Sequence, residues 1–325
     1  MKEWLRQRFP FHREEGFPPI LVVGTPRGGT TWLAELLVCA PGFRFVQEPL
    51  NLRLRSVREA SGLSEWRELW ERDADRKLLP YLRRIVVGEL RHRDTFLIRR
   101  PRRFGGRWRT NRTLLKLIHG ATSHLDALAN ELGAEVVHLV RHPIATAVSR
   151  EVFPSLDSFP GSWASERIPA RARGEAERIV REGDHLEKGV LAWSLHHYPL
   201  FRWERGERFH RLSYEELVLD PLKNLRSLAA RLRIPVTSRM EKAIRLPSLS
   251  AGKSSPAQRR AIRDPEQAQA RLGSWREAVS ASKETSLLEI AERFGIGLYR
   301  PGEILPRFPF PERAGSPVQT EFASR

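Results

Sequence analysis

The stretch GTPRGGTTW at residues 24–32 follows the apolar run PILVV at residues 19–23. This order predicts a short buried strand, a glycine-rich turn and a helix that opens on two threonines. In such a turn the backbone N–H groups converge on one spot, where the helix dipole adds positive potential. The stretch therefore predicts a cradle for a phosphate-like group.

The spacing of Gly24 and Gly29 is that of a P-loop, with one departure. A nucleotide triphosphatase carries Lys and then Ser or Thr after the last glycine. Here Thr30 takes the position of that Lys, and the basic residue Arg27 lies inside the loop. The loop is therefore poorly suited to cleaving a Mg-bound γ-phosphate. It is well suited to gripping a terminal phosphate-like group with a guanidinium and two hydroxyls.

A second phosphate-binding pattern is the segment EVVHLVRHPIATAVSR at residues 135–150. An apolar strand is expected to end on Arg141, and the helix that follows carries Ser149, eight residues further on. Arginine offers a planar fork of donors to a phosphate, and a serine on the adjacent helix reaches the same group. Both patterns fall at the carboxyl ends of strands, where ligands bind in parallel α/β sheets.

These segments resemble the phosphate-binding motifs of sulfotransferases that use 3′-phosphoadenosine 5′-phosphosulfate (PAPS). The 5′-phosphosulfate loop of that family reads basic–small–Gly–Thr/Ser–Thr/Ser–aromatic, and residues 27–32 fit it throughout. The family's 3′-phosphate motif has the spacing of Arg141 and Ser149. The segment YEEL at 214–217 is similar to the family's Tyr-Glu-Asp-Leu, whose tyrosine lies near the adenine. With Trp275-Arg276, the resemblance covers about residues 19–300.

The resemblance implies PAPS as co-substrate, 3′-phosphoadenosine 5′-phosphate (PAP) as product, and no metal. It also implies a set of cofactor-binding residues, which comprises Arg27, Gly28, Gly29, Thr30, Thr31, Trp32, Arg141, Ser149, Tyr214, Lys253 and Trp275. No clustered set of His, Cys, Asp and Glu residues in the sequence suggests a metal site.

Sulfuryl transfer to a hydroxyl needs a base and a group that stabilises the leaving oxygen. Glu48 lies 21 residues after Arg27 and resembles the Glu-Pro of carbohydrate sulfotransferases. His119 resembles the base of aryl and alcohol sulfotransferases, although KLIH at 116–119 is one residue longer than their Lys-Thr-His. Lys116 lies in an apolar strand, where an ammonium is costly unless it meets an anion.

The candidate catalytic residues are therefore Glu48, Lys116, His119 and Arg27. Glu48 is favoured as the base, because shielding by an acceptor sugar can raise its pKa toward the working pH.

An α/β, three-layer P-loop-like fold with a central parallel sheet flanked by helices is expected for residues 1–300, as a single domain. Within it, residues 51–112 combine apolar positions at helical spacing with many arginines. They are interpreted as a helical, basic acceptor-binding insertion. Residues 301–325 are expected to form a Pro-rich C-terminal extension.

The net charge of +17 favours a polyanionic partner. The arginines that crowd residues 91–112 fit a solvated basic face, a groove for an anionic glycan or a peripheral contact with a membrane surface. No nucleic acid is expected, because no helix-turn-helix, RNP or zinc pattern is visible. No apolar run is long enough for a transmembrane helix. The lone Cys39 permits no internal disulfide, so a cytoplasmic, bacterial setting is expected.

The sequence thus favours a PAPS-dependent sulfotransferase that acts on a hydroxyl of a carbohydrate or glycoconjugate, with Glu48 as base. Two alternatives stay open. One is a sulfotransferase for small alcohols or phenols with His119 as base. The other is a P-loop protein that binds a nucleotide or polysaccharide without catalysis. The sequence determines neither the acceptor nor the oligomeric state.

Overall fold

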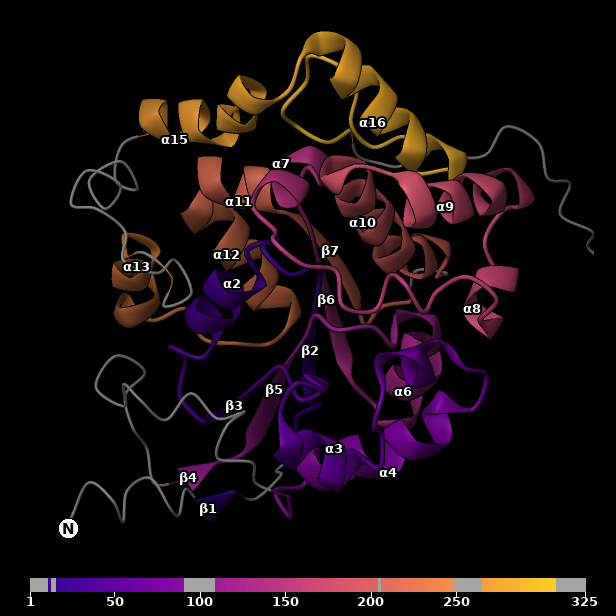
Figure 1. Ribbon diagram of the computed structural model, residues 1–325. Helices are drawn as coiled ribbons and strands as arrows, with labels where there is room; N and C mark the ends of the chain where they lie inside the picture. Colours follow the sequence, from indigo (N-terminus) through magenta and orange to yellow (C-terminus); the bar gives the residue numbers. More distant parts are fainter. Residues whose placement is uncertain are drawn as a thin grey trace, which may run out of the picture.

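Five parallel strands form the central sheet of the computed structural model, in the order β3-β5-β2-β6-β7 (Figure 1). The structure describes residues 11–12, 16–90, 109–203, 206–246, 248 and 265–307. The strands of the sheet are β2 (Ile20–Val23), β3 (Phe43–Gln47), β5 (Arg112–Leu117), β6 (Glu135–Val140) and β7 (Phe209–Ser213). A separate parallel pair joins β1 (Phe11–His12) to β4 (Arg109–Thr110).

The sequence of strand β2 is a continuous apolar run because both faces of the strand are buried. Ile20 and Val22 pack into one core cluster, whereas Leu21 and Val23 pack into another on the opposite face of the sheet. Successive strand side chains point to opposite faces, and here both faces are covered by other elements. The strand therefore carries no polar side chain on either face.

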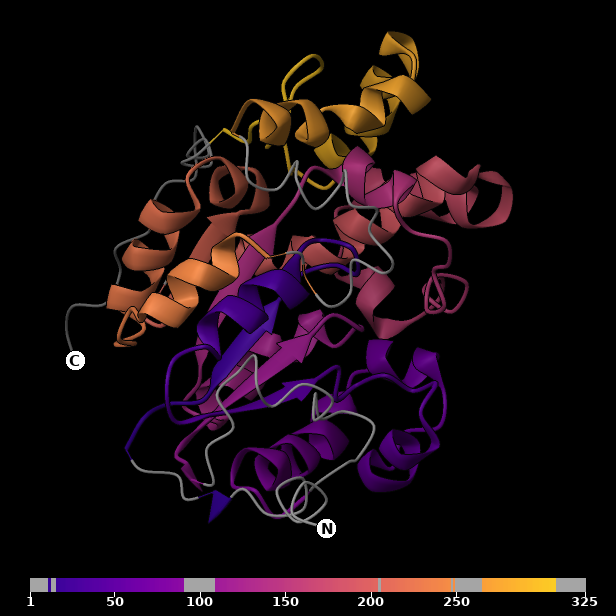
Figure 2. The same cartoon turned by 90° about the vertical axis from the view of Figure 1, so that its left-hand side faces the viewer.

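Helices cover both faces of the sheet, as Figures 1 and 2 show. The face of Ile20 carries α2 (Thr30–Leu37), α12 (Pro221–Arg231) and α13 (Ser238–Ile244). The face of Leu21 carries α3 (Arg55–Ser61), η1 (Trp66–Trp70), α4 (Ala74–Val86) and α6 (Leu125–Glu131). These two helical layers around one parallel sheet confirm the expected α/β, three-layer fold.

A third core cluster lies beyond the carboxyl edge of the sheet. It is built from α7 (Pro143–Val148), α8 (Trp163–Glu166), α9 (Ala170–Glu182), α10 (His185–Arg202) and α16 (Ala281–Arg293). The remaining elements are η2 (Thr122–His124), α11 (Tyr214–Leu219), α15 (Pro265–Leu272) and η4 (Ser274–Ala278). Because this cluster stands over the strand ends, it places α7 and α10 beside the predicted phosphate cradle.

The expected insertion at 51–112 is described in part, as α3, η1 and α4. Its arginine-rich stretch at 91–108 lies outside the described residues, and so do residues 308–325 of the expected C-terminal extension.

Candidate active site

The turn between β2 and α2 forms the predicted cradle. Its backbone closes through a hydrogen bond from the Gly28 N–H to the Thr25 carbonyl, 2.9 Å long. Gly29 has a φ of 90°, and a Cβ at this position would lie 2.3 Å from Cδ2 of Tyr214. Both the backbone and the neighbouring ring therefore require glycine here. Arg27, at the outer end of the turn, is exposed and has a φ of 68°.

Arg141 joins the second phosphate motif to the first. It follows β6, which pairs with β2 in the sheet. Its Nη1 donates to the Arg27 carbonyl over 2.7 Å, and its guanidinium lies 4.7 Å from the ring centroid of Tyr214. The Trp193 indole donates to the Arg141 carbonyl over 2.9 Å and fixes the strand end. Both of these contacts are with neutral groups, and the charge of Arg141 also interacts with the nearby Glu215 carboxyl.

Other predicted nucleotide contacts surround this pair of motifs. The ring of Trp32 meets that of Tyr214 edge-on, with centroids 6.3 Å apart. The Ser149 hydroxyl donates to the Thr146 carbonyl over 3.1 Å. Trp275 is buried and stacks on His142, the residue after Arg141, at 4.4 Å. Lys253 lies outside the described residues.

Three of the predicted catalytic side chains, Lys116, Glu48 and His119, are connected by hydrogen bonds. The Lys116 ammonium donates to Thr31 Oγ1 and to Glu48 Oε1, each over 2.8 Å. His119 Nε2 lies 3.2 Å from Glu48 Oε2. Lys116 thus meets an anion, the carboxylate of Glu48.

Strand pairing explains why Lys116 and Glu48 meet. In the register of β3 and β5, Gln47 lies opposite Lys116. The Glu48 N–H then donates to the Lys116 carbonyl over 3.1 Å. Glu48 leaves the strand with a φ of 52°, and its carboxylate also accepts from the Asn51 side chain over 3.2 Å. The turn before Pro49 therefore directs the carboxylate onto Lys116 and His119.

The charges of Lys116, Glu48 and His119 influence one another's protonation. Burial raises the pKa of the Glu48 carboxyl, but the hydrogen bond of His119 and the charge of Lys116 outweigh it and hold that pKa well below its usual range. A rise in this pKa on shielding by an acceptor sugar stays a prediction. Burial lowers the pKa of Lys116, whose side chain is only 2 % exposed, and Glu48 counteracts this effect. Burial likewise lowers the pKa of His119, so the neutral imidazole dominates at pH 7.

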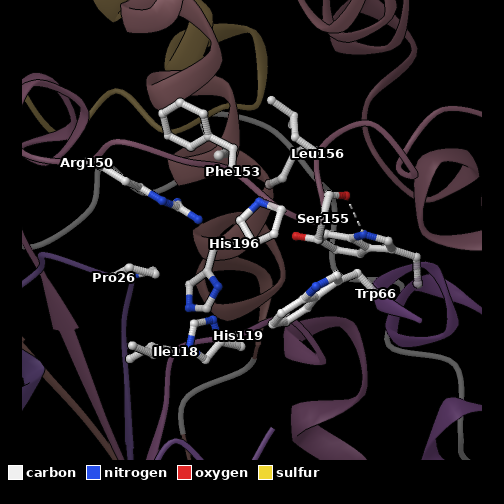
Figure 3. Close-up of a pocket in the computed structure, with 14 residues that line it drawn as sticks. Pro26, Trp66, Ile118, His119, Arg150, Phe153, Ser155, Leu156 and His196 are labelled. Atoms are coloured by element: carbon white, nitrogen blue, oxygen red, sulfur yellow. Dashed lines mark hydrogen bonds between the residues drawn. The ribbon is translucent and has the colours of Figure 1, made fainter. Parts of the chain in front are cut away.

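A pocket of about 450 Å³, part of it open to solvent, lies directly beside His119 (Figure 3). Its lining is mainly apolar and includes Trp66, Trp70, Ile118, Phe153, Pro154 and Leu156. Pro26 of the P-loop borders it, so the pocket adjoins the cradle.

The sequence analysis did not single out two polar residues of this pocket, Arg150 and His196. Arg150 comes directly after Ser149, which was a usable signal. His196 lies in the interior of α10 and carried none.

No metal site is apparent in the part of the chain that the structure describes, where no three His, Cys, Asp or Glu side chains are arranged to hold an ion. Independence from metal stays a prediction that rests on the sequence of the loop. Among the same residues, no helix is long and apolar enough to cross a membrane.

Comparison with known proteins defines the class. The sequence profile of the sulfotransferase family matches residues 18–238, about two thirds of the chain. No curated protein matches the sequence. The chain belongs to the sulfotransferase family, so the prediction of a sulfotransferase is confirmed.

Solved structures similar to this chain are distant. The sulfotransferase domain of the Synechococcus PCC 7002 olefin synthase is 18% identical over 89% of this chain and 98% of its own, with a TM-score of 0.45. Mouse sulfotransferase SULT7A1, complexed with PAP, is 17% identical over 89% of this chain and 88% of its own, with a TM-score of 0.43. The family assignment therefore rests on the sequence profile.

Proposed function

We propose that the protein transfers the sulfuryl group of PAPS to a hydroxyl group of an acceptor. The observation that carries this proposal is the chain from Thr31 through Lys116 and Glu48 to His119. One end of this chain is the P-loop helix, and the other end lines the pocket. A donor held in the cradle and an acceptor held in the pocket would therefore meet beside a base and an ammonium.

The cradle suits the two phosphate-containing ends of PAPS. The turn N–H groups, Arg27, Thr30 and Thr31 would hold the 5′-phosphosulfate, because a helix N-terminus and a guanidinium both favour an anion. Arg141, with neutral partners and Ser149 on the following helix, would hold the 3′-phosphate.

We assign the proton transfer to His119. Glu48 accepts from His119 Nε2–H, which leaves the Nδ1 lone pair to take the proton of the acceptor hydroxyl. Glu48 then stabilises the imidazolium that forms, as a carboxylate does for the histidine of a catalytic triad. The lowered pKa of Glu48 argues for this supporting role, since a carboxylate held strongly ionised is a weak base.

The reaction balances as an in-line displacement. The acceptor oxygen forms a bond to sulfur, while the bond between sulfur and the 5′-phosphate oxygen breaks, and its electron pair stays on that phosphate. Lys116 has three N–H donors and uses two for Thr31 and Glu48, so the third can stabilise the leaving oxygen. The proton of the acceptor hydroxyl moves to His119.

A second candidate keeps Glu48 as the direct base and a carbohydrate as the acceptor. One observation favours it: the side chain of Glu48 is 20% exposed, which leaves part of the carboxylate accessible to an acceptor. Under this candidate His119 orients the carboxylate instead of accepting the proton.

Matched substitutions separate the two candidates. The assay measures transfer from radiolabelled PAPS to a panel of phenols, aliphatic alcohols and glycans. With His119 as base, His119→Asn should cut kcat by about 100-fold or more, and Glu48→Gln by less. Glu59→Gln, which changes an exposed carboxylate on α3, is the control.

The pH profile gives an independent readout. Glu48 raises the pKa of His119 against the lowering by burial, so Glu48→Gln should shift the acid limb of kcat/KM to lower pH. If Glu48→Gln abolishes that limb and costs more than His119→Asn, Glu48 is the base. If the wild-type protein transfers sulfate to none of these acceptors, the proposed function is wrong.

A further inference from the structure

Arg150 places a positive charge in the acceptor pocket, and no ion pair with it is found among the described residues. Its Nε donates to the Val152 carbonyl over 3.0 Å, and its guanidinium lies 4.7 Å from the ring centroid of Phe153. Both partners are neutral. The charge of Arg53, which has the same sign, acts on the pKa of Arg150 together with burial. Burial, followed by Arg53, lowers the pKa of Arg150 to about 10, so the side chain is charged at pH 7.

A second polar group of the pocket, His196, also lacks a partner. The side chain is 6% exposed, and its Nε2 has no hydrogen-bond partner among the described residues. The Gly24 backbone acts against the effect of burial on the pKa of this ring. In a neutral imidazole one nitrogen carries the proton and the other presents a lone pair, so Nε2 can donate to a ligand or accept from it. Burial lowers the pKa of His196 to about 3, which keeps the ring neutral.

These groups lie at different parts of one pocket that has both polar and apolar walls. In Figure 3 the rings of His196 and His119 lie next to each other, and the guanidinium of Arg150 points toward them from the side of Phe153. Trp66, Leu156 and Ile118 supply apolar walls. A ligand that satisfies every group therefore needs an apolar body, a hydroxyl near the two histidines and an anionic group at Arg150.

We infer that the acceptor is a hydroxylated amphiphile with an apolar body and a carboxylate, and that the carboxylate pairs with Arg150. This inference rests on the proposed function of the site and specifies its substrate class. A carboxylate matches the planar fork of a guanidinium. It also supplies the counter-charge that a half-buried arginine otherwise lacks. The acceptor hydroxyl donates to His119 or pairs with His196, whose Nε2 has no hydrogen-bond partner among the described residues.

Binding to the protein saturated with PAP tests this inference without requiring turnover. The probes are para-hydroxyphenylpropanoate and its amide, which differ in charge but little in shape, measured by calorimetry. The acid should bind about tenfold or more tightly than the amide, as expected for a charge-assisted hydrogen bond. Arg150→Met should remove this preference, and Arg150→Lys should keep part of it. Arg231→Met, at an exposed position on α12, should leave the preference intact.

Several results would overturn the inference. They are equal binding of acid and amide to the wild type, binding of neither probe, or a preference that survives Arg150→Met. If Arg150→Met weakens PAP binding instead, Arg150 serves the nucleotide and the assignment is wrong.

The two proposals fail separately. If an acid binds through Arg150 but receives no sulfate from PAPS, the result contradicts the proposed function and still supports the inferred ligand class. Sulfation of neutral alcohols or glycans without any preference for acids supports the proposed function and overturns the inferred ligand class.

Discussion

Arg141 contacts both halves of the predicted nucleotide site through neutral partners, the carbonyl of Arg27 and the ring of Tyr214. Its place at the end of an apolar strand was readable from the sequence. Its contact with Arg27 was not, because it depends on the pairing of β2 with β6. The same holds for Glu48 and Lys116, whose residue types could be chosen from the sequence but whose contact depends on the register of β3 and β5.

Replacing Arg141 tests its predicted role. Arg141→Ala should weaken binding of PAP by about 1.5–3 kcal/mol, which is typical for the loss of a charge-assisted contact. Binding of adenosine 5′-phosphate, which lacks the 3′-phosphate, should barely change. Calorimetric titration of both nucleotides checks this, with Arg231→Ala as the control. Equal losses for the two nucleotides would show that Arg141 does not recognise the 3′-phosphate.

The positions of Arg150 and His196 in the pocket could not be predicted from the sequence. Arg150 ends the segment 135–150 but was given no role there, and His196 belongs to no motif that the sequence analysis used. Their meaning arises because the segment after Ser149 and the middle of α10 line the same pocket. Long-range packing of this kind leaves no periodic pattern in the sequence.

At the scale of elements, the turn before α2 depends on Gly29. Gly29→Ala should lower the free energy of unfolding by about 1–3 kcal/mol, because it combines a positive φ with a clash against Tyr214. Nucleotide binding should weaken with it. Urea denaturation and PAP titration measure the two effects.

Gly174 in α9 provides the matched control. A Cβ there meets nothing within 4 Å. Gly174→Ala should therefore stabilise the protein by about 0.5–1 kcal/mol through helix propensity. If Gly29→Ala proves as stable as Gly174→Ala, the described turn geometry is wrong.

The elements themselves were largely predictable. The apolar runs at 20–23 and 135–140 and the glycine-rich turn between strand and helix all matched. Residues 122–131 fold as a short 3₁₀ turn, η2, followed by α6. The strand order was not predictable, because hydrophobic patterning fixes which residues form strands but not which strands become neighbours.

At the scale of the whole molecule, buried neutral histidines make stability depend on pH. His138, His142, His196 and His197 are all buried, and burial lowers the pKa of each one below 6.5. Below pH 6.5 these histidines therefore bind protons in the unfolded chain but stay neutral in the folded protein. The free energy of unfolding should fall as the pH drops from 6.5 toward about 3, where His142 and His196 begin to titrate in the folded state.

Each of these histidines can contribute up to about 1.4 kcal/mol per pH unit within this window. Urea denaturation at several pH values between neutral and mildly acidic measures the slope. His142→Phe should reduce the slope, because it removes one titrating ring and keeps the stack on Trp275. A free energy of unfolding that stays constant over this window contradicts the prediction.

The segment that follows the family match has a consequence for how far the chain can be shortened. Glu215 accepts hydrogen bonds from the His142 N–H over 2.8 Å and from the Tyr299 hydroxyl over 3.0 Å. Together with the Trp275 stack, this ties the end of β6 to residues well beyond position 238. A chain trimmed to residues 18–238 would remove the Tyr299 hydroxyl from the buried Glu215 and the Trp275 ring from His142. The nucleotide site and the C-terminal helices therefore have to be expressed and engineered as one unit.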